Sequence, residues 1–178
     1  KLIYVSTVHV YKNQWNVIDA IYKLRQSGIK VTLTLIGPII YPPSGKKMFS
    51  KMSERDPQGE FIKYIPHVPH EELPLYYSSH DAIIFASTCE NMPNILIESM
   101  ASGLPIVCSD KQPMPEFLKQ GGYYFNANSV DSIRQSINYL IEDNDILKKI
   151  KQNLKEVRKL KWAETSKKTF NFISYLTK

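Results

Sequence analysis

The sequence is poor in the features that mark several large classes of protein. It holds two cysteines, Cys89 and Cys108, which are too few for a disulfide scaffold and have no CxxC spacing, so we expect two buried free thiols. The longest uninterrupted apolar run, residues 82–86, is far shorter than the ~20 residues that a membrane-spanning helix needs. The seven glycines form no GxGxxG fingerprint. No charged segment followed by an apolar one opens the sequence, so we expect no signal peptide in it, and a start inside a strand-like run suggests a piece of something longer.

What is present is typical of a globular chain. The 178 residues are 43% hydrophobic and 22% charged, which excludes disorder and leaves room for one domain, residues 1–178. The net charge of +6 is uneven: residues 146–178 carry ten Lys/Arg against two Glu, a local charge of +8 that leaves −2 for the rest. This basic segment indicates either an anionic surface nearby, such as membrane headgroups, or a solvated lysine-rich helix face. The aromatic residues do not alternate with basic ones, so we expect no nucleic-acid partner.

Short strand-like runs alternate with longer helical patterns along the chain. The apolar runs are continuous enough for strands covered on both faces, and they lie at residues 2–6, 31–37, 61–65, 82–86 and 105–109, with a sixth at 121–125. Apolar residues at three-and-four spacing predict helices between them, and two more helices at 146–159 and 162–176. Residues 39–45, which include two prolines, read as a surface loop. The sequence therefore predicts an α/β fold with a Rossmann-like, doubly wound parallel sheet of about six strands and extra C-terminal helices.

In such a sheet, ligands bind at the carboxyl ends of the strands, so the loops there are the candidate sites. Lys12 lies in the first of these loops, and Glu90 lies in the loop before a helix that opens near Pro93 and carries Glu98. A lysine and a helix amino end favour phosphate, and two carboxylates favour hydroxyl groups. The pattern fits a sugar-nucleotide site, although the two glutamates also fit a solvated helix.

Three other motifs are rejected. Residues 44–47 resemble the end of a P-loop, but the preceding glycine is too far upstream and Lys47 stands where a Ser or Thr should be. His67 and His70 flank a proline that prevents a helical zinc site, so no metal ligands are assigned. Cys89 has no base beside it in sequence, which argues against a nucleophile.

The stretch 89–109, CENMPNILIESMASGLPIVCS, is similar to the signature of glycosyltransferase family 4, also called group 1. Residues 113–116, the 121–125 strand and Trp162 continue the similarity, and Lys12 falls where the family carries a loop lysine. The resemblance implies the C-terminal, donor-binding half of a GT-B enzyme, whose two Rossmann-like domains hold the active site between them. It also implies a retaining sugar transfer from a nucleoside-diphosphate sugar, with no cofactor and no metal.

Carried over residue by residue, the resemblance assigns the site. Glu90, the catalytic candidate, would face the donor sugar, Lys12 the diphosphate and Glu98 the ribose hydroxyls. The remaining substrate-binding candidates come from three loops: Thr7 and His9; Pro66, His67 and Val68 beside the base; and Asn91, Met92, Pro93 and Asn94 beside sugar and phosphate.

Two departures from the family pattern fall at the donor. Thr7 stands where the family usually has an arginine, and either His9 substitutes for it or His9 is a plain loop histidine. Asn91, Met92 and Pro93 replace the usual Gly-Phe-Gly, so the sequence does not indicate which sugar the donor carries.

The resemblance also sets expectations for partners and location. The partners would be the donor and an N-terminal domain absent from this chain, so the piece alone would bind donor weakly and transfer nothing. Phe170, Phe172 and Tyr175 of the last helix would be left uncovered. The expected role is polysaccharide or glycolipid assembly in the cytoplasm, with a peripheral place at the inner face of the membrane also open. The alternatives are a catalytically silent Rossmann-like interaction module and, less favoured, an epimerase or a phosphorylase of the same architecture.

Overall fold

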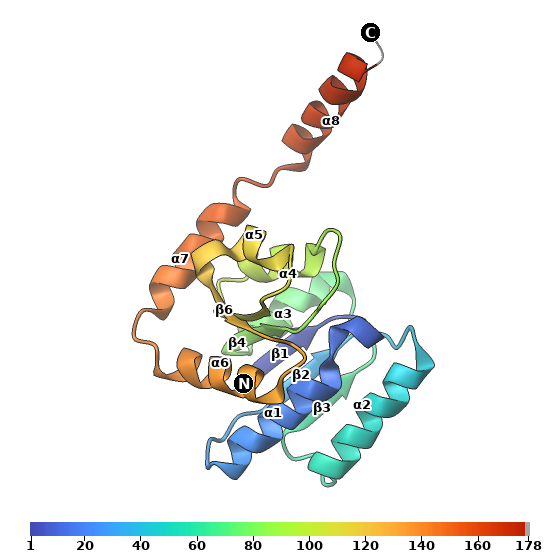
Figure 1. Cartoon of the computed structure of the whole chain (residues 1–178), viewed down its shortest axis with the longest axis vertical. Helices are drawn as coiled ribbons and strands as arrows, with labels where there is room; N and C mark the ends of the chain where they lie inside the picture. Colours follow the sequence, from blue (N-terminus) through green and yellow to red (C-terminus); the bar gives the residue numbers. More distant parts are fainter. Residues whose placement is uncertain (177–178) are drawn as a thin grey trace.

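Six parallel strands form the centre of the fold in the order β3-β2-β1-β4-β5-β6 (Figure 1). The structure is a computed structural model that describes residues 1–176. The strands are β1 (Leu2–Val5), β2 (Leu33–Ile36), β3 (Ile62–Ile65), β4 (Ala82–Phe85), β5 (Ile106–Ser109) and β6 (Gly122–Phe125). From β1 the chain winds outward to β3, and from β4 it winds outward in the other direction to β6. The order of the strands thus reverses between β1 and β4, which confirms the predicted doubly wound sheet.

The central strands are buried at every position because both of their faces are covered. All four residues of β1, β4 and β5 are buried, and the aromatic rings of Tyr4 and Phe85 meet edge to face across β1 and β4. Leu2 of β1 pairs with Leu33 of β2 on one side and with Ala82 of β4 on the other. This register aligns the carboxyl ends of β1 and β4 at one edge of the sheet.

Helices cover the sheet in two groups. In the first group, α1 (Gln14–Gln26) packs against both α2 (Pro42–Arg55) and α6 (Val130–Glu142). In the second, α4 (Asn94–Ala101) packs against α5 (Met114–Leu118) and α7 (Ile146–Val157), and the short α3 (Leu73–Ser78) precedes β4. Right-handed crossovers in opposite directions place the two groups on opposite faces of the sheet. The apolar stripe of α1, predicted from Val17, Ile18, Ile21 and Leu24, is fully buried.

The prediction of a surface loop over residues 39–45 is wrong from Pro42 onward, because α2 begins there. Pro42 and Pro43 occupy the first turn, where a helix has no use for the backbone N–H that proline lacks. Ser44 and Gly45 are buried rather than exposed. A side chain at Gly45 would approach Ile39 to 2.8 Å, so the small residue lets α2 pack closely on the segment before it.

The two C-terminal helices are present as predicted. The last of them, α8 (Trp162–Leu176), projects away from the rest of the fold and buries none of its side chains (Figure 1). Phe170, Phe172 and Tyr175 are 69%, 62% and 78% exposed, so the aromatic side chains expected to be uncovered are uncovered. Across residues 1–176, no helix has both the length and the apolar character to cross a bilayer.

Candidate functional site

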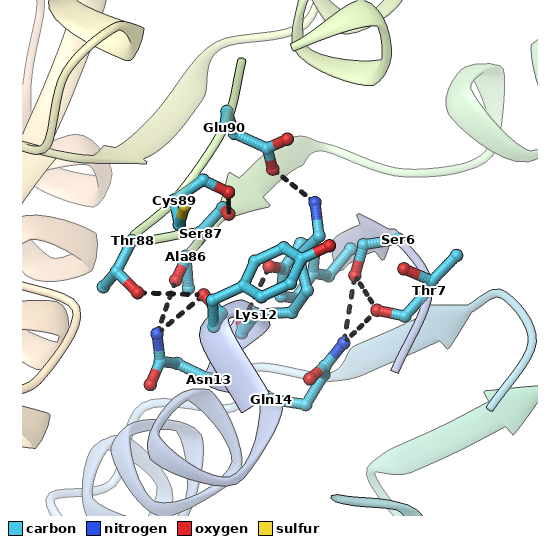
Figure 2. Close-up of polar contacts among 12 residues, drawn as sticks. Ser6, Thr7, Lys12, Asn13, Gln14, Ala86, Ser87, Thr88, Cys89 and Glu90 are labelled. Carbon is cyan, nitrogen blue, oxygen red and sulfur yellow. Dashed lines mark hydrogen bonds and ion pairs between the residues drawn. The ribbon is translucent and has the colours of Figure 1, made fainter. Parts of the chain in front are cut away.

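The carboxyl ends of β1 and β4 lie side by side where the strand order reverses, and two sequence-predicted residues meet there. Lys12 ends η1 (Val10–Lys12), the short 3-10 helix after β1, and Glu90 lies in the loop between β4 and α4. The Lys12 ammonium donates to the Glu90 carboxylate (Figure 2). In open α/β sheets this reversal point forms the crevice in which ligands bind. The structure therefore joins a cation and an acid, 78 residues apart in sequence, at the expected place.

The Lys12–Glu90 ion pair is largely removed from solvent. The Lys12 side chain is 9% exposed and that of Glu90 is 14% exposed. The Lys12 ammonium also lies 5.1 Å from the ring centroid of Tyr11 and 5.4 Å from that of Phe85, within the range of a cation–π contact. Charges in such surroundings interact more strongly than charges on an open surface, so each holds the other firmly.

A hydrogen bond from Tyr4 holds the backbone of Lys12 in place. The Tyr4 hydroxyl donates to the Lys12 carbonyl oxygen at 2.8 Å. Burial raises the pKa of Tyr4 well above its usual value, so the hydroxyl keeps its proton and remains a donor. The lysine backbone is thereby tied to the middle of β1.

The two loops that carry Lys12 and Glu90 are joined to each other. The carbonyl oxygen of Tyr11 accepts from the amide of Thr88 at 2.9 Å and from its hydroxyl at 3.2 Å. The side chain of Asn13 donates to the same Tyr11 oxygen at 3.0 Å and to the carbonyl of Ala86 at 3.1 Å (Figure 2). These bonds set the spacing of the two loops before any ligand arrives.

Thr7 and His9 lie in the same first loop. The Thr7 carbonyl accepts from the side chain of Gln14 at 2.9 Å, and Gln14 also donates to the Ser6 hydroxyl at 3.0 Å. The ring of His9 rests 4.6 Å from that of Tyr11 and 5.5 Å from that of Tyr41, and its buried Nδ1 makes no hydrogen bond within residues 1–176. His9 is therefore held among tyrosines at this edge, and Thr7 adds no charge to it.

Glu98 has a partner of its own outside the Lys12–Glu90 pair. It is the fifth residue of α4, its side chain is 38% exposed, and its carboxylate lies 3.3 Å from Nε2 of His70. Two grooves meet at Glu98. One, of about 410 Å³, runs between α3 and α4 past His70 and Tyr77. The other, of about 290 Å³, lies between α4 and the start of α8 at Trp162.

Sequence reasoning did not assign His70 itself to the site, because the residue was weighed only as a metal ligand. It opens η2 (His70–Glu72), the 3-10 helix between β3 and α3. Its place at the end of a strand-following loop at the carboxyl edge, a candidate loop from the sequence, is the signal that pointed to it. The neighbouring candidates Pro66, His67 and Val68 lie in the same β3–α3 connection, and Val68 packs against the core.

The loop before α4 supplies the remaining candidates. Pro93 precedes the helix, whose first residue is Asn94, so the helix begins one residue later than Pro93. The backbone amide of Asn94 donates to the carbonyl oxygen of Met92 at 2.9 Å, and the amide of Ile97 donates to the carbonyl oxygen of Pro93 at 3.0 Å. Met92 is 45% exposed, and Asn91 is exposed too, so this loop is open to a ligand.

One of the two cysteines is buried as expected and the other is not. Cys108 is buried in β5, and burial raises the pKa of its thiol, which keeps it protonated and inert. Cys89 is exposed, because it lies on the β4–α4 loop beside Glu90 and not in a strand.

The sequence model of a known family, described as "Glycosyl transferases group 1", matches residues 1–157. The chain belongs to this family. O-antigen chain mannosyltransferase B of Escherichia coli is 26% identical to this group 1 chain over 172 residues, which cover 95% of the chain and 44% of that protein. This chain thus spans less than half the length of that relative.

Solved structures share the fold. HepE of Anabaena, crystallised with UDP and glucose, superposes with a TM-score of 0.83 at 18% identity, over 97% of this chain and 47% of that one. The C-terminal domain of the group 1 protein LpcC of Francisella tularensis superposes with a TM-score of 0.74 at 20% identity, over 89% of this chain and 84% of that one. These likenesses agree with the predicted Rossmann-like domain of GT-B type.

Proposed function

We propose that this chain is the donor-binding domain of a retaining glycosyltransferase that moves a sugar from a nucleoside-diphosphate sugar to a glycan, glycolipid or similar acceptor. The observation that carries the proposal is the meeting of Lys12 and Glu90 at the reversal point of the sheet. A diphosphate needs a cation, and a sugar needs hydrogen-bond acceptors, so a crevice with both suits a molecule that joins the two. The family membership and the UDP and glucose of the HepE structure support the same ligand class.

The proposed roles are those that the family resemblance implies, applied to the positions of these residues. Lys12 faces the diphosphate, together with the amino end of α4, and Glu90 faces the donor sugar as the catalytic residue. Glu98, with His70 beside it, accepts from the ribose hydroxyls. The other donor contacts are assigned to Thr7 and His9, to Pro66, His67 and Val68 at the base, and to Asn91, Met92, Pro93 and Asn94. No metal is assigned, because a lysine and a helix amino end already offset the charge of the diphosphate.

The acceptor half of the enzyme is proposed to be a separate N-terminal domain. The LpcC domain that this chain resembles is a C-terminal one, and the mannosyltransferase of E. coli is more than twice as long as the matched region. The uncovered aromatic face of α8 is proposed to pack on that domain, and the piece alone is proposed to transfer no sugar.

The proposed location is the cytoplasm, at the inner face of the membrane. On α7, Lys148, Lys151 and Lys155 are exposed and make no ion pair within the described residues. A basic face of this kind is attracted to anionic headgroups, each lysine contributing about 1 kcal/mol near the surface.

A thermal-shift and calorimetric titration of the 178-residue chain with UDP-, GDP- and dTDP-sugars tests the donor site. We expect stabilisation by the sugars of one base, and roughly tenfold or greater loss of affinity in Lys12→Met and in Glu98→Gln, because each removes a charge-assisted bond. Glu142→Gln, an exposed acid at the end of α6, is the control and should bind as the wild type does. No stabilisation by any sugar nucleotide at millimolar concentration contradicts the proposal.

The same variants decide between this function and a catalytically silent interaction module. The uncharged Thr7 in the place of the family's arginine is the observation that favours a silent module. If Lys12→Met and Glu98→Gln leave donor binding and the activity of the full-length enzyme unchanged, the silent module is the better assignment.

A further inference from the structure

Lys12 and Glu90 neutralise each other in the structure, although the proposed function gives each of them a different part of the donor to hold (Figure 2). Lys12 is assigned to the diphosphate and Glu90 to the sugar. The lysine ammonium cannot turn fully to a phosphate while the carboxylate holds it. A ligand whose phosphate binds the Lys12 ammonium therefore competes with the Glu90 carboxylate for it.

The surroundings of the pair make that competition costly. The side chains are 9% and 14% exposed, and the rings of Tyr11 and Phe85 lie beside the ammonium. Removing one partner from a buried ion pair leaves the other charge without compensation, which costs far more than breaking a pair on the surface. The bonds from Asn13 to Ala86 and from Thr88 to Tyr11 hold the two loops together, so the loops are not free to carry the charges apart.

We propose that Glu90 is a specificity-determining residue that favours the intact sugar nucleotide over the bare nucleoside diphosphate. The inference rests on the proposed function. A bare diphosphate binds Lys12 and leaves the Glu90 carboxylate without its cation and without a donor to accept from. A sugar nucleotide binds Lys12 as well, but its sugar hydroxyls donate hydrogen bonds to the Glu90 carboxylate and so replace the lysine as its partner.

The consequence concerns the end of the reaction. Once the sugar has left, the remaining nucleoside diphosphate no longer satisfies Glu90, and Glu90 regains Lys12. The ion pair seen in the structure is then the resting state to which the site returns, and its re-formation promotes release of the product.

The test compares paired ligands on the 178-residue chain by calorimetry: UDP with UDP-glucose, and GDP with GDP-mannose. In the wild type, the sugar nucleotide of the accepted base should bind more tightly than its diphosphate. In Glu90→Gln, which removes the competing charge, the diphosphate should bind about tenfold more tightly than in the wild type, while the sugar nucleotide gains little. The ratio of the two affinities therefore falls.

The Lys12→Met variant shows whether the effect of Glu90→Gln on diphosphate affinity depends on Lys12. In Lys12→Met, the further change Glu90→Gln should shift diphosphate affinity by no more than about twofold, because the competition is already gone. Glu142→Gln, which removes one negative charge far from the pair in sequence, should leave the ratio unchanged. If Glu90→Gln fails to fold, the apolar pair Lys12→Met/Glu90→Met replaces it, since apolar side chains of similar volume substitute well for a buried ion pair. This double variant should bind the diphosphate and its sugar nucleotide with nearly equal affinity.

The outcomes separate the inference from the function on which it rests. If the wild type binds a sugar nucleotide and the ratio does not fall in folded Glu90→Gln, the inference is overturned and the donor site stands. An equal gain of diphosphate affinity in the Lys12→Met background also overturns it, because the effect is then one of general charge. If no variant and no wild type binds either ligand, the proposed function itself fails.

Discussion

The side-chain nitrogen of Asn13 donates to the carbonyl oxygen of Ala86, 73 residues away, at 3.1 Å (Figure 2). Asn13 also adopts φ 54° and ψ 31°, the left-handed conformation that asparagine tolerates better than most residues. It lies between η1 and α1, as the C-cap of the first and the N-cap of the second, and it binds the Lys12 loop to Ala86, the residue that follows β4. The position of the site's lysine thus depends in part on a residue that is not assigned to the ligand.

Substitution of Asn13 separates its two contributions. Asn13→Ala should lower the free energy of unfolding by about 2–4 kcal/mol, because it leaves the buried Ala86 carbonyl short of a donor and forces alanine into a left-handed conformation. Asn13→Gly loses the hydrogen bonds but not the conformation, so it should be more stable than Asn13→Ala by about 1 kcal/mol. Urea unfolding measures both.

Asn16→Ala is the matched control for the asparagine pair. Asn16 donates from its side chain to the carbonyl of Ala127 at 2.8 Å but lies within α1, so its replacement removes a hydrogen bond alone. It should cost less than Asn13→Ala and leave donor affinity unchanged, whereas both Asn13 variants should weaken donor binding. An Asn13→Ala chain as stable as Asn13→Gly would show that no strain resides at this position.

Much of the fold was predictable because the strands are apolar enough to show that helices cover both faces of the sheet. A strand such as residues 82–85 is apolar throughout only when both faces are covered, and that condition implies a parallel sheet with helices on both sides. The same topology places loop residues at the carboxyl edge, which is why Lys12 and Glu90 could be assigned to one crevice in advance, although not to one ion pair. Their separation of 78 residues did not matter, since the rule concerns strand ends and not sequence distance.

What could not be predicted depends on tertiary contacts or on ambiguous residues. Proline both ends and begins helices, so Pro42 and Pro43 suggested a loop although they open α2. The contact of His70 with Glu98 joins two helices whose relative position the sequence does not show. The left-handed backbone of Asn13 is likewise set by its bond to β4, and nothing in the local sequence demands it.

Gly37 and Gly28 offer a test of how tightly β2 approaches β1. Both have positive φ, 139° and 89°, but a side chain at Gly37 would lie 2.2 Å from the carbonyl oxygen of Ser6, while one at Gly28 would meet nothing within 4 Å. Gly28→Ala should therefore cost about 1 kcal/mol of unfolding free energy from backbone strain alone. Gly37→Ala should cost about 3 kcal/mol or more, because the end of β1 must also move.

The glycine comparison has a functional readout as well. Ser6 directly precedes Thr7 at the candidate site, so displacement of the β1 end by Gly37→Ala should also weaken donor binding, and Gly28→Ala should not affect it. Urea unfolding together with a donor titration distinguishes the two variants. Equal costs in stability would show that the close approach of the strands at Gly37 relaxes freely.

Glu156 joins α7 to the rest of the domain through Lys119 and also binds Lys159, three residues further along the chain. Its carboxylate accepts from Lys119 at 2.6 Å and from Lys159 at 2.7 Å, and Gln152 donates to it at 3.2 Å. The side chain is 10% exposed. The hydrogen bond from Lys119, followed by that from Lys159, lowers the pKa of Glu156 from its usual value of 4.5 to about 2.

This lowered pKa predicts the pH range in which Glu156 stabilises the fold. A carboxylate with a lower pKa in the folded than in the unfolded chain stabilises fully above the unfolded value, here near 4.5, and loses that effect as the pH falls toward about 2. Glu156→Gln should therefore be less stable than the wild type at pH 7 and at pH 6 by the same amount. The difference should shrink steadily at pH 4, 3 and 2.5, as measured by urea unfolding. A constant gap for Glu156→Gln down to pH 2.5 would mean that the two lysines do not favour the charged form of Glu156.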